Sequence, residues 1–395
     1  MKLVRIESVA ELRRLAHSWD DLWERCEATL PTLRCELLAQ WVEHFAPAAR
    51  FLAVAVESED RLIAALPLVG GRRRVANLPT NAWSMAGDLL LDPNAPADSA
   101  LHLLCEGLKR LPWLIIHGEG APLDSRRWRL FFETLREHGH ATAARKQFDV
   151  GVIDLGGDWS TYQASLSGNH RRALGKSLRK LQADGRVELK VHRHLSPDEA
   201  ERLLRIVCEI EDKSWKGEAG TSILRTPGML DYYRREAQQL AALGHLEILL
   251  LEHEGRPIAA EYGYAAKGVS HSHKIAYDPE FSYAGPGRLL RYLQLERYFD
   301  EGQYHLLDTL GILSEANAKW STRSYSVSRV LISTGGPIGQ ALVGGYKTIW
   351  PHVRKLLRRS PPPPAEKLGA AGYLDAVAND VRKPTTRSRQ PANPC

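Results

Sequence analysis

Alternating and helix-spaced apolar residues divide the second half of the chain into short elements. Val187–His192 alternates like a strand. Ser196 predicts the start of a helix, because serine caps a first turn, Pro197 fits in that turn, and the two acids that follow favour its positive end. We expect this helix to continue to about Trp215.

Three strands joined by hairpins come next. Glu254-Gly255 and Lys267-Gly268 separate apolar runs in the manner of two-residue hairpin turns. The pattern predicts a helix at 226–243, strands at 245–253, 257–266 and 269–277, a helix at 288–299, a strand at 304–309, a short helical segment at 316–322 and a strand at 325–334.

The first half gives a similar order of elements. It predicts a strand at 2–6, helices at 10–25 and 35–45, strands at 51–57, 61–69 and 74–91, a helix at 97–111, a strand at 113–117, a helix at 124–138 and a strand at 148–155. Residue identity between the halves is slight, so the repeat rests on element order. We therefore predict an α/β (α+β) protein with two similar domains, residues 1–157 and 158–345, each a central mixed, mostly antiparallel sheet flanked by helices.

The C-terminal region differs in composition. A helix is expected at 346–359, and a proline run begins at Pro361. Because proline forces an extended backbone, residues 360–395 are expected to form a disordered tail without chemistry.

Composition restricts the class of protein. Of the 395 residues, 44% are hydrophobic and 25% charged, which excludes a wholly disordered chain. No apolar run approaches the ~20 residues of a membrane-spanning helix, and the N-terminus lacks a signal-peptide pattern. We expect a cytoplasmic protein. A net charge of +6 admits phosphates, nucleic acid or an anionic membrane surface as partners.

The five cysteines are scattered, without a Cys-x-x-Cys pair or a matching histidine spacing. This argues against a disulfide framework and against a structural zinc site. We expect no metal, and we expect most of the cysteines to be small buried hydrophobic residues.

One glycine-rich turn favours a phosphate. Gly285-Pro286-Gly287 lies between a predicted strand and a predicted helix, and Arg288 adds a positive charge in the first turn. Free backbone N–H groups at a helix start attract anions, and glycine lets them approach closely. A lone Gly-x-Gly is more often an ordinary turn.

The wider pattern resembles the GNAT N-acetyltransferase superfamily, in which a Gln/Arg-x-x-Gly-x-Gly/Ala loop binds the coenzyme A pyrophosphate. Over about Trp159–Thr334 it is most similar to a bacterial branch related to FemAB aminoacyltransferases and to acetyltransferases associated with cellulose and exopolysaccharide biosynthesis. The segments that carry this resemblance are Ser214-Trp215-Lys216-Gly217, Gly255–Ala260, Tyr277–Leu290, Lys319-Trp320 and the basic helix 170–182.

The resemblance implies acetyl-CoA or a longer acyl-CoA as co-substrate, bound by Ser282, Gly285, Gly287 and Arg288. Two departures weaken this loop. Ser282 replaces the usual Gln or Arg, and Pro286 removes an N–H donor. The first half has no equivalent Gly-x-Gly, so it is expected to serve as a scaffold or substrate wall.

Acyl transfer requires a base for the acceptor, stabilisation of an oxyanion and a proton for the leaving thiolate. Glu261 is a candidate base because it lies in the middle of a predicted central strand; a paired glutamate is as plausible. Alternation places His271, His273 and Tyr277 on one face of the next strand, where a structural histidine is the alternative.

Asp308 ends the fifth strand of the second half, where the resemblance puts the acyl-transfer cleft; a capping role is the alternative. Tyr304 and Tyr325 are candidate proton donors.

The resemblance places Trp215 and Lys216 beside the acceptor, where tryptophan stacks on a ring and lysine holds an anionic group; packing of a helix-end tryptophan is the alternative. Lys319 is a further substrate-binding candidate. The helix 170–182 is densely basic, with Arg171, Arg172, Lys176, Arg179 and Lys180. It predicts either a solvated face or contact with a phosphate-bearing precursor, a tRNA or an anionic membrane.

Together these features predict an acyl-CoA-dependent N- or O-acyltransferase acting on an envelope or polysaccharide precursor. Two alternatives remain: a FemAB-like transferase that uses aminoacyl-tRNA, and a non-catalytic module that binds a polyanion within a synthase complex. The acceptor and the oligomeric state are not set by the sequence.

Overall fold

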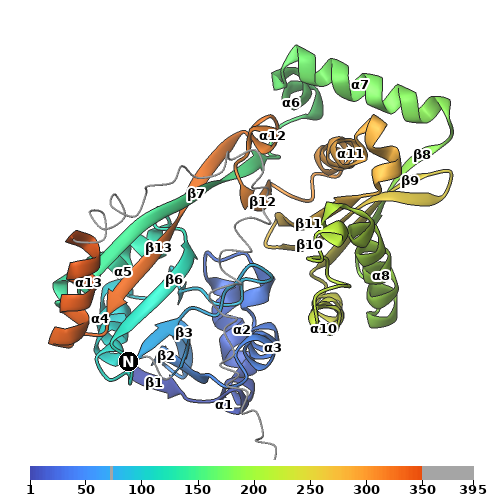
Figure 1. The fold of residues 1–395 in the computed structure, drawn as a ribbon. Coiled ribbons are helices and arrows are strands. Elements are labelled where there is room, and N and C mark those ends of the chain that lie inside the picture. The colour runs from blue at the N-terminus through green and yellow to red at the C-terminus, as the bar shows by residue number, and fades with distance from the viewer. Residues whose placement is uncertain (72–73, 349–395) are drawn as a thin grey trace, which may run out of the picture.

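The computed structural model describes residues 1–71 and 74–348 (Figure 1). Its helices are α1 (Val9–Arg14), α2 (Ala16–Arg25), η1 (Pro31–Leu33), α3 (Cys35–Phe45), α4 (Ala97–Leu108), α5 (Arg126–Glu137), α6 (Trp159–Ser165), α7 (Gly168–Ala183), α8 (Pro197–Lys213), α9 (Trp215–Glu218), α10 (Met229–Ala242), η2 (Pro279–Ala284), α11 (Pro286–Glu301), α12 (Glu315–Ala318) and α13 (Pro337–Thr348). Its strands are β1 (Lys2–Ile6), β2 (Arg50–Ser58), β3 (Arg61–Gly70), β4 (Val75–Asn77), β5 (Leu90–Leu91), β6 (Ile115–Ala121), β7 (Thr142–Asp154), β8 (Val187–His192), β9 (Leu246–His253), β10 (Arg256–Ala266), β11 (Val269–Tyr277), β12 (Leu306–Ile312) and β13 (Arg323–Ser333).

The strands form one continuous mixed sheet flanked by helices. Its order is β1-β2-β3-β4-β6-β13-β7-β12-β11-β10-β9-β8, with β5 paired to β3. The parallel pairs β4–β6 and β11–β12 lie among antiparallel neighbours. The fold is therefore the mixed, mostly antiparallel α/β architecture that the sequence predicts.

Two long strands are exchanged at the centre of this sheet. Strand β7 closes the first run of elements but pairs with β12, whereas β13 closes the second run and pairs with β6. The two strands also pair with each other over ten residues, side by side in Figure 1. The division of the chain at residues 157 and 158 stays a prediction, and the hydrogen-bonded sheet runs across it.

Three hydrophobic cores pack against the sheet. Helices α4 and α5 pack on β2 and β3 together with Val330 and Ile332 of β13. Helix α11 packs on β9 and β10 through Leu289, Leu290 and Leu295. A third core joins α2 and α3 of the first half with α8 and α10 of the second. The opposite face of β9–β11, turned away from α11, is thus covered by both halves.

The sequence-based boundaries hold for most elements. Both predicted hairpin turns are present, with positive φ at Glu254-Gly255 and at Lys267-Gly268. The strand predicted at 74–91 is wrong: only β4 and β5 form at its ends, and the loop between them contacts α10 and β11.

The C-terminal helix also starts earlier than expected, at Pro337 instead of residue 346. Most of the predicted helix 346–359 and the whole predicted tail 360–395, including Cys395, lie outside the described residues.

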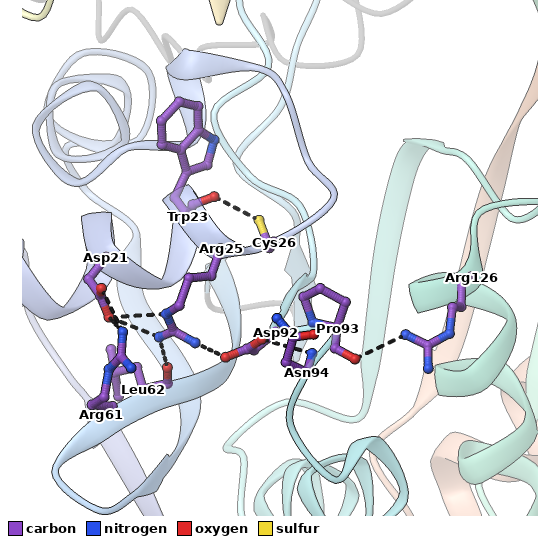
Figure 2. Close-up of polar contacts among 10 residues, drawn as sticks. All are labelled: Asp21, Trp23, Arg25, Cys26, Arg61, Leu62, Asp92, Pro93, Asn94 and Arg126. Atoms are coloured by element: carbon purple, nitrogen blue, oxygen red, sulfur yellow. Dashed lines mark hydrogen bonds and ion pairs between the residues drawn. The ribbon is translucent and has the colours of Figure 1, made fainter. Parts of the chain in front are cut away.

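An arginine ties α2 to the strands beneath it (Figure 2). Arg25 forms ion pairs with Asp21 at 2.9 Å and with Asp92, and it donates a hydrogen bond to the carbonyl oxygen of Leu62 at 2.7 Å. Arg61 pairs with the same Asp21 carboxylate at 3.0 Å. This cluster fixes the helix that covers the central face of the sheet.

Candidate active site

Strands β11 and β12 pair only at their beginnings. Their parallel register covers Val269, Ser270 and His271, opposite Leu306, Leu307 and Asp308. Beyond this point β12 pairs with β7 at Ile312, while β11 keeps only β10 as a neighbour in the described chain. The edge of β11 facing β12 therefore carries free backbone groups just before α11 begins.

A row of polar side chains crosses the sheet where these strands part. Tyr264 of β10 lies opposite His271 of β11, and His271 lies opposite Asp308 of β12. Paired residues point to the same face of a sheet, so the three side chains are neighbours on the face away from α11. All three are buried.

Asp308 is held by two donors. The backbone N–H of Leu310 donates to Oδ1 at 2.8 Å, and the Tyr325 hydroxyl of β13 donates to Oδ2 at 2.9 Å. Leu310 has a positive φ of 49°, which bends the chain back over the carboxylate. Burial raises the pKa of Asp308 to about 6, although both hydrogen bonds oppose the rise.

Several buried polar atoms around Asp308 lack partners in the described residues. They are the Tyr264 hydroxyl, both ring nitrogens of His271 and Nε of Arg127. Burial lowers the pKa of His271 to about 4, so its ring is neutral at pH 7. The nearby Thr29 backbone partly offsets this lowering of the pKa, but neither ring nitrogen forms a hydrogen bond within the described residues. Unpaired buried polar groups are costly, so their grouping favours a polar ligand here.

Arg127 brings the first half into this region. Its guanidinium donates to Asp88 at 2.6 Å, and its charge acts on the Tyr325 hydroxyl. Neither Arg127 nor Tyr264 is a candidate from the sequence. For Tyr264 a signal exists, because alternation along β10 puts it on the face opposite Glu261.

A β-bulge changes the face assignment on β11. The register with β10 shifts between Tyr262 and Gly263, which leaves His273 as the extra residue. As a result Tyr277 lies on the α11 face, not with His271 and His273 as strict alternation predicts. His273 meets the Trp83 carbonyl oxygen at 2.9 Å and the Tyr233 hydroxyl at 3.1 Å, and burial holds its pKa well below the usual range.

Glu261 is buried under α11, on the other face of the sheet from Asp308. It pairs with Arg291 at 2.9 Å and accepts a hydrogen bond from Gln294 at 2.9 Å. Arg291 in turn donates to Gln294 and to Ser272. The structure thus matches the paired-glutamate alternative; the role of Glu261 as a base stays an untested prediction.

The Gly285-Pro286-Gly287 turn caps α11. Gly285 is left-handed, with φ 60°, and its N–H donates to the Ser282 carbonyl oxygen at 3.0 Å. The N–H of Arg288 bonds back to Gly285 at 3.0 Å, so Gly287 supplies the N–H left free for a ligand at this turn. A Cβ on Gly287 would lie 3.4 Å from the Tyr277 ring. Tyr277 is 40% exposed beside this turn.

Cations gather around this helix start. Arg288 and Lys319 are both exposed, and both charges lower the pKa of His170, after the larger effect of burial. The His170 ring packs on Trp320 at 4.5 Å between centroids. Lys319, which follows α12, and Arg288 of the turn therefore both lie within electrostatic range of His170.

The segment after α8 lies on the opposite face. Trp215 is 47% exposed, and Lys216 pairs with the buried Glu211 at 2.7 Å. Gly217 allows a close turn, because a Cβ there would lie 1.7 Å from the carbonyl oxygen of Asp212. The exposed Trp215 side chain is therefore available to a ligand, whereas the Lys216 ammonium already forms an ion pair with Glu211.

Helix α7 presents its charges outward. Arg171, Arg172, Lys176, Arg179 and Lys180 are exposed, while Leu174 and Leu181 are buried. Lys180 lies 4.4 Å from the centroid of the Tyr283 ring, so α7 reaches η2 beside the glycine turn. In Figure 1 α7 extends over α11.

The described ranges hold neither a metal-ligand cluster nor a membrane-spanning helix. Residues 1–71 and 74–348 contain no group of three or more His, Cys, Asp or Glu placed to hold a metal ion. Their cysteines Cys26, Cys35, Cys105 and Cys208 are free and buried. No helix in these ranges has the length and apolarity needed to cross a bilayer.

One family model matches part of the second half. Residues 168–319 match the family model of the acetyltransferase (GNAT) domain. No curated protein is similar in sequence.

Several solved structures are similar to this chain at low sequence identity. FemX is 10% identical with a TM-score of 0.54, over 87% of this chain and 100% of its own. The C-terminal domain of a putative lysylphosphatidylglycerol synthetase from Agrobacterium fabrum is 13% identical with a TM-score of 0.50, over 85% and 95%. A tandem GNAT protein from the clavulanic acid pathway is 14% identical with a TM-score of 0.46, over 85% and 99%.

Proposed function

Because residues 168–319 match the family model of the acetyltransferase (GNAT) domain, we propose that this protein is an acyltransferase that uses acetyl-CoA or a longer acyl-CoA. The observation that carries the proposal is the buried Asp308, placed where β11 and β12 part and tuned to a pKa of about 6. A base whose pKa lies near the working pH is suited to proton transfer.

The chain offers a place for the donor. The free N–H of Gly287, the positive end of α11 and the cations Arg288 and Lys319 fit a pyrophosphate. The open edge of β11 fits an extended chain that needs backbone hydrogen bonds. When bound, acyl-CoA supplies the activated thioester carbonyl.

The remaining roles fall to side chains on the other face of the sheet. Asp308 would accept the proton of the acceptor amine or hydroxyl as the acceptor attacks the acyl carbonyl. The thioester C–S bond would break as the acyl–acceptor bond forms, and the leaving thiolate would take up a proton, so that the thiol is released. Tyr325 and the Leu310 N–H hold the carboxylate in one orientation. Tyr264 carries a free hydroxyl donor, whose raised pKa keeps it protonated, toward the same place.

The acceptor class follows from the resemblance: an amine or hydroxyl of an envelope or polysaccharide precursor, modified in the cytoplasm. The second candidate is transfer from aminoacyl-tRNA, as in FemAB-like enzymes. It is favoured by the single free N–H of the glycine turn and by the exposed cations of α7.

Calorimetry with acetyl-CoA and longer acyl-CoAs tests the donor assignment. Gly287→Glu puts a side chain and a negative charge where the pyrophosphate is proposed to lie, so it should abolish the saturable binding seen with wild type. Gly157→Glu is the matched control, because Gly157 is exposed with open space around it. Equal binding by wild type and Gly287→Glu, at equal stability, contradicts the proposal; binding of charged tRNA in its place favours the second candidate.

A further inference from the structure

Lys274 occupies an unusual position on β11. Because of the bulge at His273, its side chain lies on the same face as His271 and Asp308. Its ammonium lies 4.8 Å from the centroid of the Trp83 ring and 5.3 Å from that of Tyr233. Cation–π contacts of this kind leave the N–H donors free for another partner.

No protein group takes those donors. In the described part of the chain the Lys274 ammonium forms no hydrogen bond or ion pair, and the residue is half-buried. A lysine in such a setting normally has an acceptor, since an unpaired ammonium is costly to remove from water.

The two carboxylates whose charges act on Lys274 are already occupied. Glu211 binds Lys216 at 2.7 Å and the N–H of Ile223 at 2.9 Å. Glu236 accepts hydrogen bonds from the hydroxyls of Tyr232, Tyr262 and Ser84 at 2.9–3.1 Å. Neither carboxylate forms an ion pair with the Lys274 ammonium in the described residues, although the charges of both act on it.

The first half of the chain closes this region. Asn81 accepts hydrogen bonds from the N–H groups of Trp83 and Ser84, which fixes the loop between β4 and β5. Within that loop the Trp83 carbonyl accepts from Tyr233 at 2.7 Å, and the Ser84 hydroxyl donates to Glu236. Trp83 is therefore a rigid aromatic wall beside Lys274.

We propose that Lys274 binds an oxyanion, a carboxylate or a phosphate, of the acceptor, with Trp83 and Tyr233 as its aromatic walls. This inference rests on the proposed acyltransferase function and names a property of its acceptor. The first half then contributes directly to acceptor recognition through Trp83.

Electrostatics support the assignment. Burial, followed by the charge of Lys216, lowers the pKa of Lys274 to about 8, while Glu211 and Glu236 oppose the lowering. Burial also raises the pKa of Glu236 to about 7, so that carboxyl is only partly ionised near neutral pH. Positive charge is thus in excess, and an incoming anion would compensate it.

Spacing places this oxyanion site away from the reacting atom. Lys274 lies opposite Tyr262 and His271 lies opposite Tyr264, two residues apart on β10, which corresponds to about 7 Å along the sheet at roughly 3.3 Å per residue. The acceptor should therefore carry its anionic group several bonds from its nucleophile.

Ligand-observed NMR titrations without an acyl donor test the proposal. The probes are 6-aminohexanoate against hexylamine, and glucosamine 6-phosphate against glucosamine. Wild type should bind at least one probe that bears the anionic group (the charged probe) about tenfold more tightly than the amine that lacks this group. Whether the carboxylate pair or the phosphate pair responds distinguishes the two kinds of oxyanion.

Three variants give the readout. Lys274→Gln should abolish the preference for the charged probe, and Lys274→Arg should keep most of it. Lys213→Gln is the matched control, because Lys213 is exposed and pairs with Asp278. Thermal melts establish that each variant is folded.

Absence of any charged preference in wild type, or an unchanged preference in Lys274→Gln, overturns the proposal. Because the titrations need no donor, their failure is distinct from failure of the acyl-CoA calorimetry. Acyl-CoA binding with no charged preference would retain the acyltransferase and reject the oxyanion site.

Discussion

Asp308 is the residue on which the proposed chemistry depends. Asp308→Asn removes the base, keeps an oxygen acceptor for the Leu310 N–H, and offers an amide N–H to the Tyr325 hydroxyl, which can accept as well as donate. We expect acyl transfer to fall by roughly 10²–10⁴-fold, the usual contribution of general base catalysis. The check is thiol release from acyl-CoA in the presence of acceptor, with donor binding measured separately and expected to be unchanged.

The same carboxyl sets a pH dependence. Its raised pKa means that the base is inactive below about pH 6 and active above it, so kcat/KM for the acceptor should rise through that value. The free energy of unfolding changes with pH in the opposite direction. Because the folded state favours the protonated carboxyl, Asp308 adds to the free energy of unfolding fully below its unfolded pKa, and this addition is lost as the pH rises through about 6. Asp308→Asn should therefore unfold no more readily than wild type at pH 7.

At the residue scale, the sequence predicts Asp308 at the end of a strand over 304–309, whereas the structure places it inside β12. Its role as a base stays a prediction. Tyr277 was assigned to the wrong face, because a bulge at His273 inserts one residue into the alternation and nothing local marks it. The same bulge moves Lys274 to the face of His271. Its aromatic neighbour there, Trp83, lies 191 positions earlier in the chain, so the sequence around Lys274 does not indicate this contact.

Among the elements, α7 carries an electrostatic prediction. Replacing Arg171, Arg172 and Lys176 by Gln removes three exposed charges. If α7 binds phosphates of the acceptor, the acceptor KM should rise in the variant. The slope of log KM against log salt concentration should also decrease by about 0.7–0.9 for each phosphate contact that is lost. Acyl-CoA binding should not change.

Unaltered acceptor kinetics at every salt concentration would make α7 an ordinary solvated face. Loss of tRNA binding in the same variant would instead support the aminoacyl-tRNA candidate.

Helix α2 depends on one ion cluster. Arg25→Met leaves Asp92, which is largely buried, without its cation, so we expect a loss of about 2 kcal/mol of unfolding free energy in urea. Arg61→Met is the control: Arg61 meets the same Asp21 but is 58% exposed, and its loss should cost below about 1 kcal/mol. Equal effects of the two variants would contradict this account of Figure 2.

Elements with strong local signals were predictable. Both two-residue hairpin turns require positive φ, which glycine provides at the second position, and both formed. The strand prediction for 74–91 is wrong because most of this segment forms a loop, whose apolar residues pack on other elements and do not pair in the sheet.

At the scale of the whole molecule, the exchange of β7 and β13 links the halves. A chain ending at residue 157 would leave β6 without β13, and a chain starting at 158 would leave β12 without β7. We expect each piece alone to be unfolded or aggregated by circular dichroism and sedimentation, and the two co-expressed to form one complex. Cooperative folding of either piece alone would show that the exchange is dispensable.

The sequence pattern predicted the repeated order of elements but not this exchange. Alternation specifies which face a strand buries, whereas the choice of neighbour depends on contacts between residues more than a hundred positions apart. For that reason the continuous sheet and the row of Tyr264, His271 and Asp308 beside Arg127 emerged only from the structure.

Hydrogen–deuterium exchange with and without acyl-CoA tests the central claim most directly. If the donor lies along the free edge of β11 and against the start of α11, acyl-CoA should slow exchange at residues 272–277 and at Gly287, and Gly287→Glu should remove this protection. Protection confined to other parts of the chain, or no protection at saturating acyl-CoA, would contradict the account.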